Sequence, residues 1–453
     1  MKREKFGTRL GAILAAAGSA VGLGNIWRFP IETGQNGGAA FIIIYIMCII
    51  MLGLPVMISE FLIGRYTHTN TAGAYRILSK GKKWRWIGRM GVFTGWFILC
   101  YYVVVGGWTM HYTFLSATNA FGGVKSTEFG NIFNQFVGNP WQPLLWFVLF
   151  VLITHFVITR GVQSGIERYS KILMPTLFII VVFLAVSSVM LPGASAGVEF
   201  LLRPEWSKVN STVVIEAMGQ AFYSLSIGMG CLCTYASYFD KSTPLAKTAL
   251  HVCVIDTMIA ILAGFIIFPS VFNIGMNPNE VGVGASLTFI SLPNVFQQSL
   301  GEGSLMSVLF SAMFYFLLFV AALTSAISLH EVATAYVSEE YNMTRHRGAM
   351  IVTATVLVLG ALCSLSFGLL SGVKLIGRNI FAMFDDLAGM ILLPIGVMFI
   401  SLFAGWRLDR ELYRNEISNH GDLRTPYFRL LIFLLRYAIP IAIAVVFIDQ
   451  IFR

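Results

Sequence analysis

Charged side chains are scarce in this 453-residue sequence. Asp, Glu, Lys and Arg together make up 12% of the residues, whereas hydrophobic residues make up 57%. A soluble globular protein carries about 25% charged residues, so water is not the only solvent of this chain. The composition excludes a disordered chain, a collagen-like fibre and a disulfide-stapled secreted scaffold. It predicts an integral membrane protein.

Cysteine is also rare, and no catalytic motif is complete. The six cysteines all fall inside apolar segments, where they are expected to pack as small hydrophobic side chains: Cys48, Cys100, Cys231, Cys233, Cys253 and Cys363. His330 and Glu331 resemble the start of a zinc-protease motif, but Thr334 stands where the second histidine belongs. No Ser/His/Asp set, phosphate-binding loop or dinucleotide fingerprint is present. The sequence therefore does not predict an enzyme.

Long apolar runs, in contrast, recur along the whole chain. A membrane-spanning helix needs about 20 mostly apolar residues. Eleven segments meet this requirement, at roughly 10–30, 38–63, 87–118, 141–158, 166–190, 212–237, 248–274, 306–337, 348–371, 376–403 and 428–450. No loop between them is long enough to form a separate domain. We expect an all-α integral membrane protein in which residues 1–453 form one transmembrane domain.

The positive charges are distributed unevenly between the two sets of loops. If the N-terminus is cytoplasmic, about three quarters of the 31 Lys and Arg residues fall in cytoplasmic segments, as the positive-inside rule requires. This clustering accounts for the net charge of +9 without a nucleic-acid partner. An odd number of spans then places the C-terminus outside.

Two spans are interrupted by Gly-x-Gly near their middle. Residues 18–25 of the first span read GSAVGLGN, and residues 224–230 of the sixth read SLSIGMG. These spans correspond in two five-helix halves, about 10–190 and 212–403, which an extra helix at about 428–450 follows. Interrupted helices at equivalent positions point to a transporter site at the midplane, because freed backbone groups cannot face lipid. Glycine-mediated helix packing is the alternative, but it does not require the polar residues beside the glycines.

Ionisable residues inside the spans need partners within the protein. Arg28 follows the first break, where an arginine costs from roughly 3 kcal/mol upward. The candidate partner is the doublet Asp385 and Asp386 in the tenth span. An ion pair that forms and separates would act as a gate, and a permanent structural pair is the alternative. Glu60 in the second span is expected to accept hydrogen bonds from unwound backbone.

Oxygen atoms suited to a small hard cation occur in three spans. Thr324 and Ser325 supply hydroxyls in the eighth span, and carbonyls freed at the first break supply more. The alternative is that these hydroxyls bond back to their own helix. Asp256 lies in the middle of the seventh span, where a buried carboxylate stays ionised only beside a cation. Asn25 and Ser224 could offer neutral oxygens to the same ion.

Residues 16–30 (AAGSAVGLGNIWRFP) and 35–41 (QNGGAAF) resemble the neurotransmitter:sodium symporter family, in particular its bacterial amino-acid transporters. Supporting motifs run from Arg3 to Gly389. The resemblance implies a five-plus-five inverted-repeat fold with discontinuous first and sixth helices. It implies that the protein carries an amino acid into the cell with sodium by alternating access. The family's usual twelfth helix is absent, as in some bacterial members, which favours a bacterial inner (plasma) membrane.

The same resemblance implies two sodium sites and one substrate pocket. The first sodium site would comprise Ala20, Asn25, Ser224 and Asp256. The second would comprise Gly18, Val21, Ala321, Thr324 and Ser325. The substrate pocket would comprise Ser19, Ala20, Leu23, Gly24, Ile98, Tyr102, Tyr223, Ser224, Ser226, Met229, Ser325 and Leu329. The substrate carboxylate would meet the amides of Leu23 and Gly24, the hydroxyl of Tyr102 and the first sodium ion.

Departures from the family pattern refine the expected chemistry. Asp256 stands where the family usually has asparagine. Because animal relatives use chloride to supply that negative charge, we expect no chloride requirement here. Gly22 stands where monoamine members carry an aspartate, so the substrate must bring its own carboxylate. Tyr223 and Met229 favour a hydrophobic or aromatic amino acid. A small, polar or amine-like substrate and a transport-inactive sensor are the alternatives.

The resemblance also assigns the moving parts. The outer gate would be the ionic pair Arg28 and Asp385 under a lid of Tyr102 and Tyr223. The inner latch would pair Arg3 with Glu339, supported by Ser237 and Tyr238. In the fifth span, Gly165 and Pro175 have the Gly-x9-Pro spacing that marks helix unwinding in bacterial relatives. A proline removes one helix hydrogen bond and kinks the chain, so this unwinding is physically reasonable.

Overall fold

The computed structural model of the chain describes residues 4–80, 83–276 and 284–452, with side chains described as far as residue 449. Over these ranges the regular structure is helical apart from one isolated β-bridge between Leu375 and Arg378. Within the described ranges nine helices are long and apolar enough to cross a membrane, and one bent pair raises the number to ten. The eleventh expected span is the second broken helix, each half of which is short.

The uninterrupted spans include several helices that contain a π-helical turn (η). They are α3–η2–α4 (Ala39–Cys48, Ile49–Gly53, Leu54–Thr67), α6 (Arg85–Ala117), α8 (Gln142–Thr159), η3–α9 (Val162–Glu167, Arg168–Val189), α13 (Leu245–Asn273), α15 (Leu305–Glu340), α16 (Arg345–Leu365), α17–η7–α18–η8 (Ile380–Asp386, Leu387–Leu392, Leu393–Leu402, Phe403–Arg407) and α20–η9–α21 (Phe428–Phe433, Leu434–Ala438, Ile439–Phe452). Short helices join them: α5 (Thr71–Leu78), α7 (Phe129–Gly138), α10 (Ala194–Leu202), the 3₁₀ helix η4 (Trp206–Lys208), η6 (Leu287–Ser291), α14 (Leu292–Leu300) and α19 (Arg410–Ile417).

Both expected breaks are present. The first span runs as α1 (Arg9–Ala20) and then η1–α2 (Gly24–Arg28, Phe29–Gln35), and its two parts are bent by 51°. The sixth runs as α11 (Ser211–Ser224) and α12 (Cys231–Ala236). Between these two helices Ser226, Gly228 and Gly230 adopt φ of 52°, 88° and 77°. Glycine enters this region without steric cost, which explains the Gly-x-Gly sequence.

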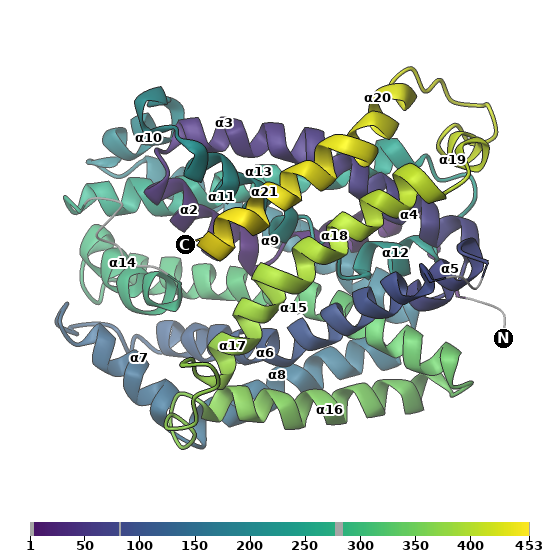
Figure 1. Ribbon diagram of the computed structural model, residues 1–453. Helices are drawn as coiled ribbons and strands as arrows, with labels where there is room; N and C mark the ends of the chain where they lie inside the picture. The colour runs from purple at the N-terminus through teal and green to yellow at the C-terminus, as the bar shows by residue number, and fades with distance from the viewer. Residues whose placement is uncertain (1–3, 81–82, 277–283, 453) are drawn as a thin grey trace.

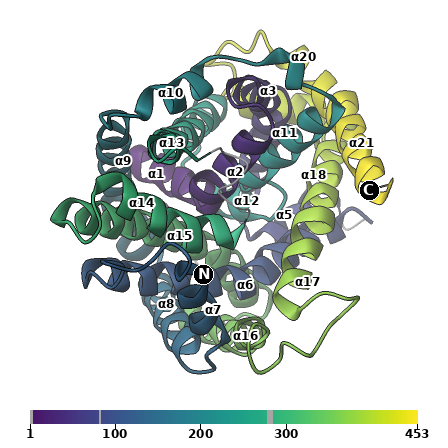
Figure 2. The ribbon, with the colours of Figure 1, turned by 90° about the vertical axis from the view of Figure 1, so that its left-hand side faces the viewer.

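The broken helices lie inside the bundle. Figure 2 looks along the long helices and shows α1, α2 and α12 surrounded by α13, α15, α6 and α18. α1 packs against α9, α13 and α15, and α12 packs against α4 and α15. In Figure 1, α2, α10 and α14 gather at one end of the bundle, and α5, α19 and the N-terminal segment at the other. The freed backbone of both breaks therefore faces protein rather than lipid.

Candidate functional site

A buried carboxylate marks the point where the two helix breaks meet. Asp256 of α13 is fully buried. Its carboxylate accepts hydrogen bonds from the Asn25 amide at 2.7 Å, the Ser224 hydroxyl at 2.9 Å and the Tyr45 hydroxyl at 3.4 Å. Asn25 lies at the start of η1 and Ser224 ends α11. Three predicted residues thus meet in space, with Ala20 at the adjoining end of α1.

Tyr45 was not identified from the sequence. Its hydroxyl oxygen also lies 3.0 Å from the Ser224 hydroxyl oxygen, so it joins the same polar cluster. The sequence held one indication of its role: Tyr45 is the single phenol among the apolar residues 42–48 of α3. A tyrosine hydroxyl needs a hydrogen-bond partner when it is buried. Such a tyrosine indicates a polar neighbour but does not say which one.

A second set of oxygens surrounds the end of α1. The last carbonyls of a helix lack partners within it, and here the Ser325 hydroxyl of α15 lies 3.1 Å from the Val21 carbonyl oxygen. It also lies 3.4 Å from that of Ser19 and 3.5 Å from that of Gly18. The hydroxyl therefore reaches across to the broken helix instead of bonding back.

The hydroxyl of the neighbouring residue, Thr324, bonds back to its own helix, which was the alternative expectation. Thr324 donates to the carbonyls of Val320 and Ala321 within α15, at 3.2 and 3.0 Å. It still lies beside α1, because a methyl group built on Gly18 would come within 3.3 Å of the Thr324 Cβ. The five predicted residues thus lie together where α1 packs against α15. Neutral oxygens at close range suit a small hard cation.

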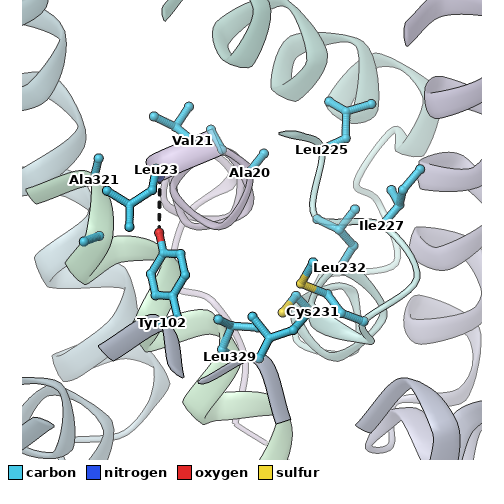
Figure 3. Close-up of a cluster of buried hydrophobic side chains, with 14 of the residues drawn as sticks. Ala20, Val21, Leu23, Tyr102, Leu225, Ile227, Cys231, Leu232, Ala321 and Leu329 are labelled. Carbon is cyan, nitrogen blue, oxygen red and sulfur yellow. Dashed lines mark hydrogen bonds between the residues drawn. The ribbon is translucent and has the colours of Figure 1, made fainter. Parts of the chain in front are cut away.

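Backbone amides at the first break face a phenol. The Leu23 N–H donates to the Tyr102 hydroxyl at 3.3 Å, as Figure 3 shows. A methyl group built on Gly22 would lie 2.5 Å from the Ser325 hydroxyl oxygen and 2.9 Å from the Tyr102 oxygen. No side chain fits at residue 22 without displacing them. Amides at the start of a helix favour an anion, so a carboxylate is suited to this position.

The walls beside this amide are mostly apolar. In Figure 3, Leu329 lies next to Tyr102, and Cys231 lies on the far side of Leu329, beside Leu232. The predicted pocket residues Ile98, Met229 and Leu329 are all buried. Cys231 was not among the predicted pocket residues, although its burial as a small hydrophobic side chain agrees with the sequence.

Two of the predicted pocket serines, Ser19 and Ser226, donate their hydroxyl hydrogens to protein. The Ser226 hydroxyl donates to the Ser19 carbonyl at 2.8 Å, and the Ser19 hydroxyl donates to the Ser328 hydroxyl at 2.9 Å. Because each hydroxyl has one hydrogen to donate, neither has a donor left for a ligand. The pocket therefore behaves as a less polar surface than its composition indicates.

A cavity of about 830 Å³ opens beyond the break on the side of α2. Leu23, Gly24 and Tyr102 line it, together with Arg28 and Asp385. Both members of the predicted outer gate thus border one space. Tyr223, the second lid residue, borders it too.

In this structure Arg28 bonds elsewhere. Its guanidinium pairs with Glu32 at 3.3 Å and lies 5.1 Å from the centre of the Tyr223 ring. Among the described residues no ion pair joins Arg28 to Asp385. The neighbouring carboxylate of the doublet, Asp386, pairs with Arg378 at 3.2 Å. Of the two aspartates, Asp385 therefore borders the cavity and takes part in neither of these two ion pairs.

The predicted inner latch is described only in part, because Arg3 lies outside the described residues. Glu339 accepts hydrogen bonds from the Asn70 backbone at 2.7 Å and from the Asn70 side chain at 3.0 Å. The Tyr238 hydroxyl donates to Glu331 at 2.6 Å. The Tyr238 carbonyl accepts from the Phe6 amide at 3.1 Å. Ser237 donates its hydroxyl to the Thr234 carbonyl.

The fifth span is continuous here, with Gly165 in its first π-helical turn and Pro175 inside α9. Glu167, which the sequence did not single out, ties this span to the segment before α1. It accepts from the Gly7 amide at 2.6 Å and from the Thr8 hydroxyl at 2.8 Å. An acidic residue at the start of an apolar span was the available signal.

Two other sequence features have structural partners. Glu60 accepts from the Gly228 amide at 2.8 Å, as expected for unwound backbone. The residues of the incomplete zinc-protease motif belong to a hydrogen-bond network. The two ring nitrogens of His330 form hydrogen bonds with the hydroxyls of Thr334 and Thr353, each at 2.9 Å. Glu331 pairs with Arg345 at 2.5 Å. Across the described ranges no group of three His, Cys, Asp or Glu residues could hold a metal.

Known proteins similar to this chain were identified by sequence and by structure. The model of the Sodium:neurotransmitter symporter family matches residues 3–131 and 131–453. An uncharacterized sodium-dependent transporter of Bacillus subtilis is 36% identical over 450 residues, 99% of this chain and 98% of that protein. One of Haemophilus influenzae is 33% identical over 462 residues, 100% of this chain and 99% of that protein. The structure of MhsT in complex with L-phenylalanine aligns with a TM-score of 0.88 at 41% identity, over 98% of this chain and 99% of that chain.

Proposed function

Because the chain belongs to the sodium:neurotransmitter symporter family, we propose that it carries a hydrophobic or aromatic amino acid into the cell together with sodium. It is a multi-pass, sodium-dependent transporter and not an enzyme. The observation that carries the proposal is the meeting of both helix breaks at Asp256, with the Leu23 amide and Tyr102 close by on the same break.

Two sodium ions accompany each substrate in this proposal. The first binds at Asp256 with Asn25, Ser224 and the Ala20 carbonyl, and its charge is balanced by the carboxylate. The second binds among the carbonyls of Gly18, Val21 and Ala321 and the hydroxyls of Thr324 and Ser325. The convergence of these oxygens between α1 and α15 supports the second site.

Chloride has no required role in this proposal. A fixed carboxylate at Asp256 supplies the negative charge that would otherwise have to come from a bound halide. A sodium ion bound by Asn25 and Ser224 would lie close to this carboxylate, because both side chains are within hydrogen-bond distance of it. Opposite charges at such separations attract each other strongly in a buried site.

The substrate binds with its carboxylate at the Leu23 and Gly24 amides and its side chain between Ile98, Met229 and Leu329. The lack of space at Gly22 agrees with a substrate that brings its own carboxylate. The hydrogen bonds that occupy Ser19 and Ser226 favour an apolar side chain over the small, polar or amine-like alternative. L-phenylalanine, to which MhsT is bound, belongs to the proposed class.

The working cycle alternates access between the two ends of one domain, residues 1–453, in a bacterial inner membrane. With the N-terminus in the cytoplasm and the C-terminus outside, the 830 Å³ cavity is the outer approach to the site. Substrate binding draws Arg28 from Glu32 to Asp385 and closes Tyr102 and Tyr223 over the site. The present Arg28–Glu32 pair is the open arrangement of this gate.

Inward release requires loosening of the cytoplasmic end of the broken first helix. We assign this loosening to the contacts between the N-terminal segment and the fifth span, which the Glu167 hydrogen bonds now hold. Unwinding between Gly165 and Pro175 would separate these partners and open a path for the second sodium ion. The inner pair of Arg3 and Glu339 parts in the same step.

A binding screen tests the proposal. Purified protein is tested against the twenty amino acids in sodium and again in potassium, beside a Ser325→Ala variant. Sodium-dependent binding of Leu, Phe, Tyr or Trp, weakened by the variant, is the expected result. Thr176→Ala serves as the control, because its exposed hydroxyl bonds only its own helix. Binding indifferent to sodium would refute the symport mechanism, and sodium-dependent binding of only glycine or a polar ligand would refute the substrate class.

A further inference from the structure

In the described part of the protein, one arginine of the last span has no acidic partner. Arg436 lies in η9, between Arg429 and Asp449 in an otherwise uncharged run. Among the described residues no carboxylate lies within ion-pair distance of Arg436. A charged side chain within a spanning helix normally pairs within the protein or marks a functional site.

The guanidinium is held in a fixed orientation by the end of the neighbouring span. Its Nε–H donates to the Gly405 carbonyl at 2.5 Å, and its Cζ atom lies 5.0 Å from the centre of the Trp406 ring. The Trp406 indole N–H donates back to the Arg436 carbonyl at 3.1 Å. A methyl group on Gly405 would come within 2.9 Å of the Arg436 Cγ, so glycine allows this close approach.

Capping the helix that ends near Gly405 uses only one of five donors. A guanidinium has five N–H groups, and the structure gives the remaining four no acceptor in the described part of the protein. Helix capping alone therefore leaves most of the hydrogen-bonding capacity of Arg436 free. A fork of N–H donors with a full positive charge matches the oxygens of a phosphate group.

The surroundings of these donors face the bilayer. Figure 2 shows α20 and α21 at the edge of the bundle, outside α18. The side chains around the guanidinium are exposed, by 54% for Trp406, 43% for Tyr437 and 54% for Phe433. The centre of the Tyr437 ring lies 5.4 Å from that of Trp406 and 5.6 Å from that of Phe433. Exposed tryptophan and tyrosine are typical of the headgroup level of a membrane.

We infer that Arg436 and the aromatic rings around it form a binding site for the phosphate of an anionic phospholipid such as phosphatidylglycerol. Arg407, which is exposed and also lacks an ion pair in the described ranges, adds a second positive charge next to Trp406. A zwitterionic lipid carries its own counter-charge and would leave both arginines unbalanced. Basic pockets between spans bind anionic headgroups on this physical basis.

The experiment measures lipid binding by native mass spectrometry of the full chain in detergent. Wild type is titrated with phosphatidylglycerol, with phosphatidylcholine of the same chains and with inorganic phosphate. We expect retained phosphatidylglycerol adducts, and about five-fold weaker binding in Arg436→Gln, the effect of one basic residue at a membrane surface. Arg168→Gln is the matched control, because it removes an exposed arginine of α9, which lies on the opposite side of the bundle from α21 (Figure 2).

Three results would overturn the inference. Phosphatidylcholine binding as tightly as phosphatidylglycerol would remove the role of charge. Equal retention by Arg436→Gln and Arg168→Gln would leave Arg436 as a helix cap only. Competition by inorganic phosphate at equal concentration would show a free-phosphate site. If Arg436→Gln folds poorly, Trp406→Leu keeps the charge and the Gly405 bond, and it is expected to weaken phosphatidylglycerol binding without loss of the folded state.

Discussion

Replacing Asp256 by asparagine is the most direct test of the proposed first sodium site. The substitution keeps the size of the side chain and one oxygen but removes the negative charge. That carboxylate now accepts from Asn25 at 2.7 Å and from Ser224 at 2.9 Å. Asn25 donates to one carboxylate oxygen and Ser224 to the other. The amide of the Asp256→Asn variant keeps its carbonyl oxygen as the acceptor for Asn25 and turns its NH2 toward the Ser224 hydroxyl, which can accept a hydrogen bond as well as donate one. The main change is therefore electrostatic.

The size of the effect follows from Coulomb's law. Two unit charges about 4 Å apart attract by about 4 kcal/mol at an effective dielectric constant of 20. The neutral amide recovers part of this as a ligand. A loss of about 1.4–2.8 kcal/mol remains, which corresponds to a ten- to hundred-fold higher sodium concentration for half-maximal binding. Because a halide can restore the missing charge, chloride should reverse part of the loss in the variant only.

The assay is equilibrium binding of a radiolabelled amino acid over a sodium titration, in chloride and again in gluconate. Asp386→Asn is the control, since it also removes a carboxylate but one that pairs with Arg378. The control should keep the wild-type sodium dependence. An Asp256→Asn variant with an unchanged sodium titration would refute the assignment of the first site. A wild-type requirement for chloride would refute the charge-balance reasoning.

Three further predictions concern single side chains. Gly22→Ala places a methyl group 2.5 Å from the Ser325 hydroxyl oxygen. Overpacking of this kind costs about 1–3 kcal/mol, so substrate binding should weaken by about tenfold in folded protein, and binding within twofold of wild type would contradict the geometry. Pro175→Ala removes a residue that disfavours continuous helix by about 3 kcal/mol. Equilibrium binding should persist while uptake into proteoliposomes slows, and unchanged uptake would count against unwinding of this span. Thr353→Val takes away a hydroxyl 2.9 Å from the buried His330 ring, a loss of about 1–3 kcal/mol. The thermal unfolding midpoint should fall by several degrees, and an unchanged midpoint would show that the ring finds another partner.

The membrane fold could be predicted from local properties of the chain. Apolar runs of spanning length and uneven Lys and Arg loops depend on composition alone. The two helix breaks depend on short sequences as well. A span with glycines at 228 and 230 can take the positive φ values of 88° and 77°, whereas branched residues there would resist unwinding. For these reasons a single sequence was sufficient for the all-helical fold and its interruptions.

Partner choice at the gates depended on packing. From the sequence, either Asp385 or Asp386 was a candidate partner of Arg28. In the structure Asp386 pairs with Arg378 instead, at 3.2 Å. Arg28 itself pairs with Glu32, four residues ahead on its own helix. Which carboxylate a cation meets depends on side-chain position to within a few ångströms, and spacing along the chain does not set that distance.

The sequence by itself determined which spans carry buried polar groups, because residues that depart from the apolar pattern inside a span must be satisfied by protein or ligand. What only the tertiary structure decided is where each polar group finds its partner. Thr324 and Ser325 are adjacent on α15, yet Thr324 bonds its own helix and Ser325 reaches the Val21 carbonyl. The difference arises because successive residues of a helix point about 100° apart, and only the packing of α1 against α15 determines which of them faces the break.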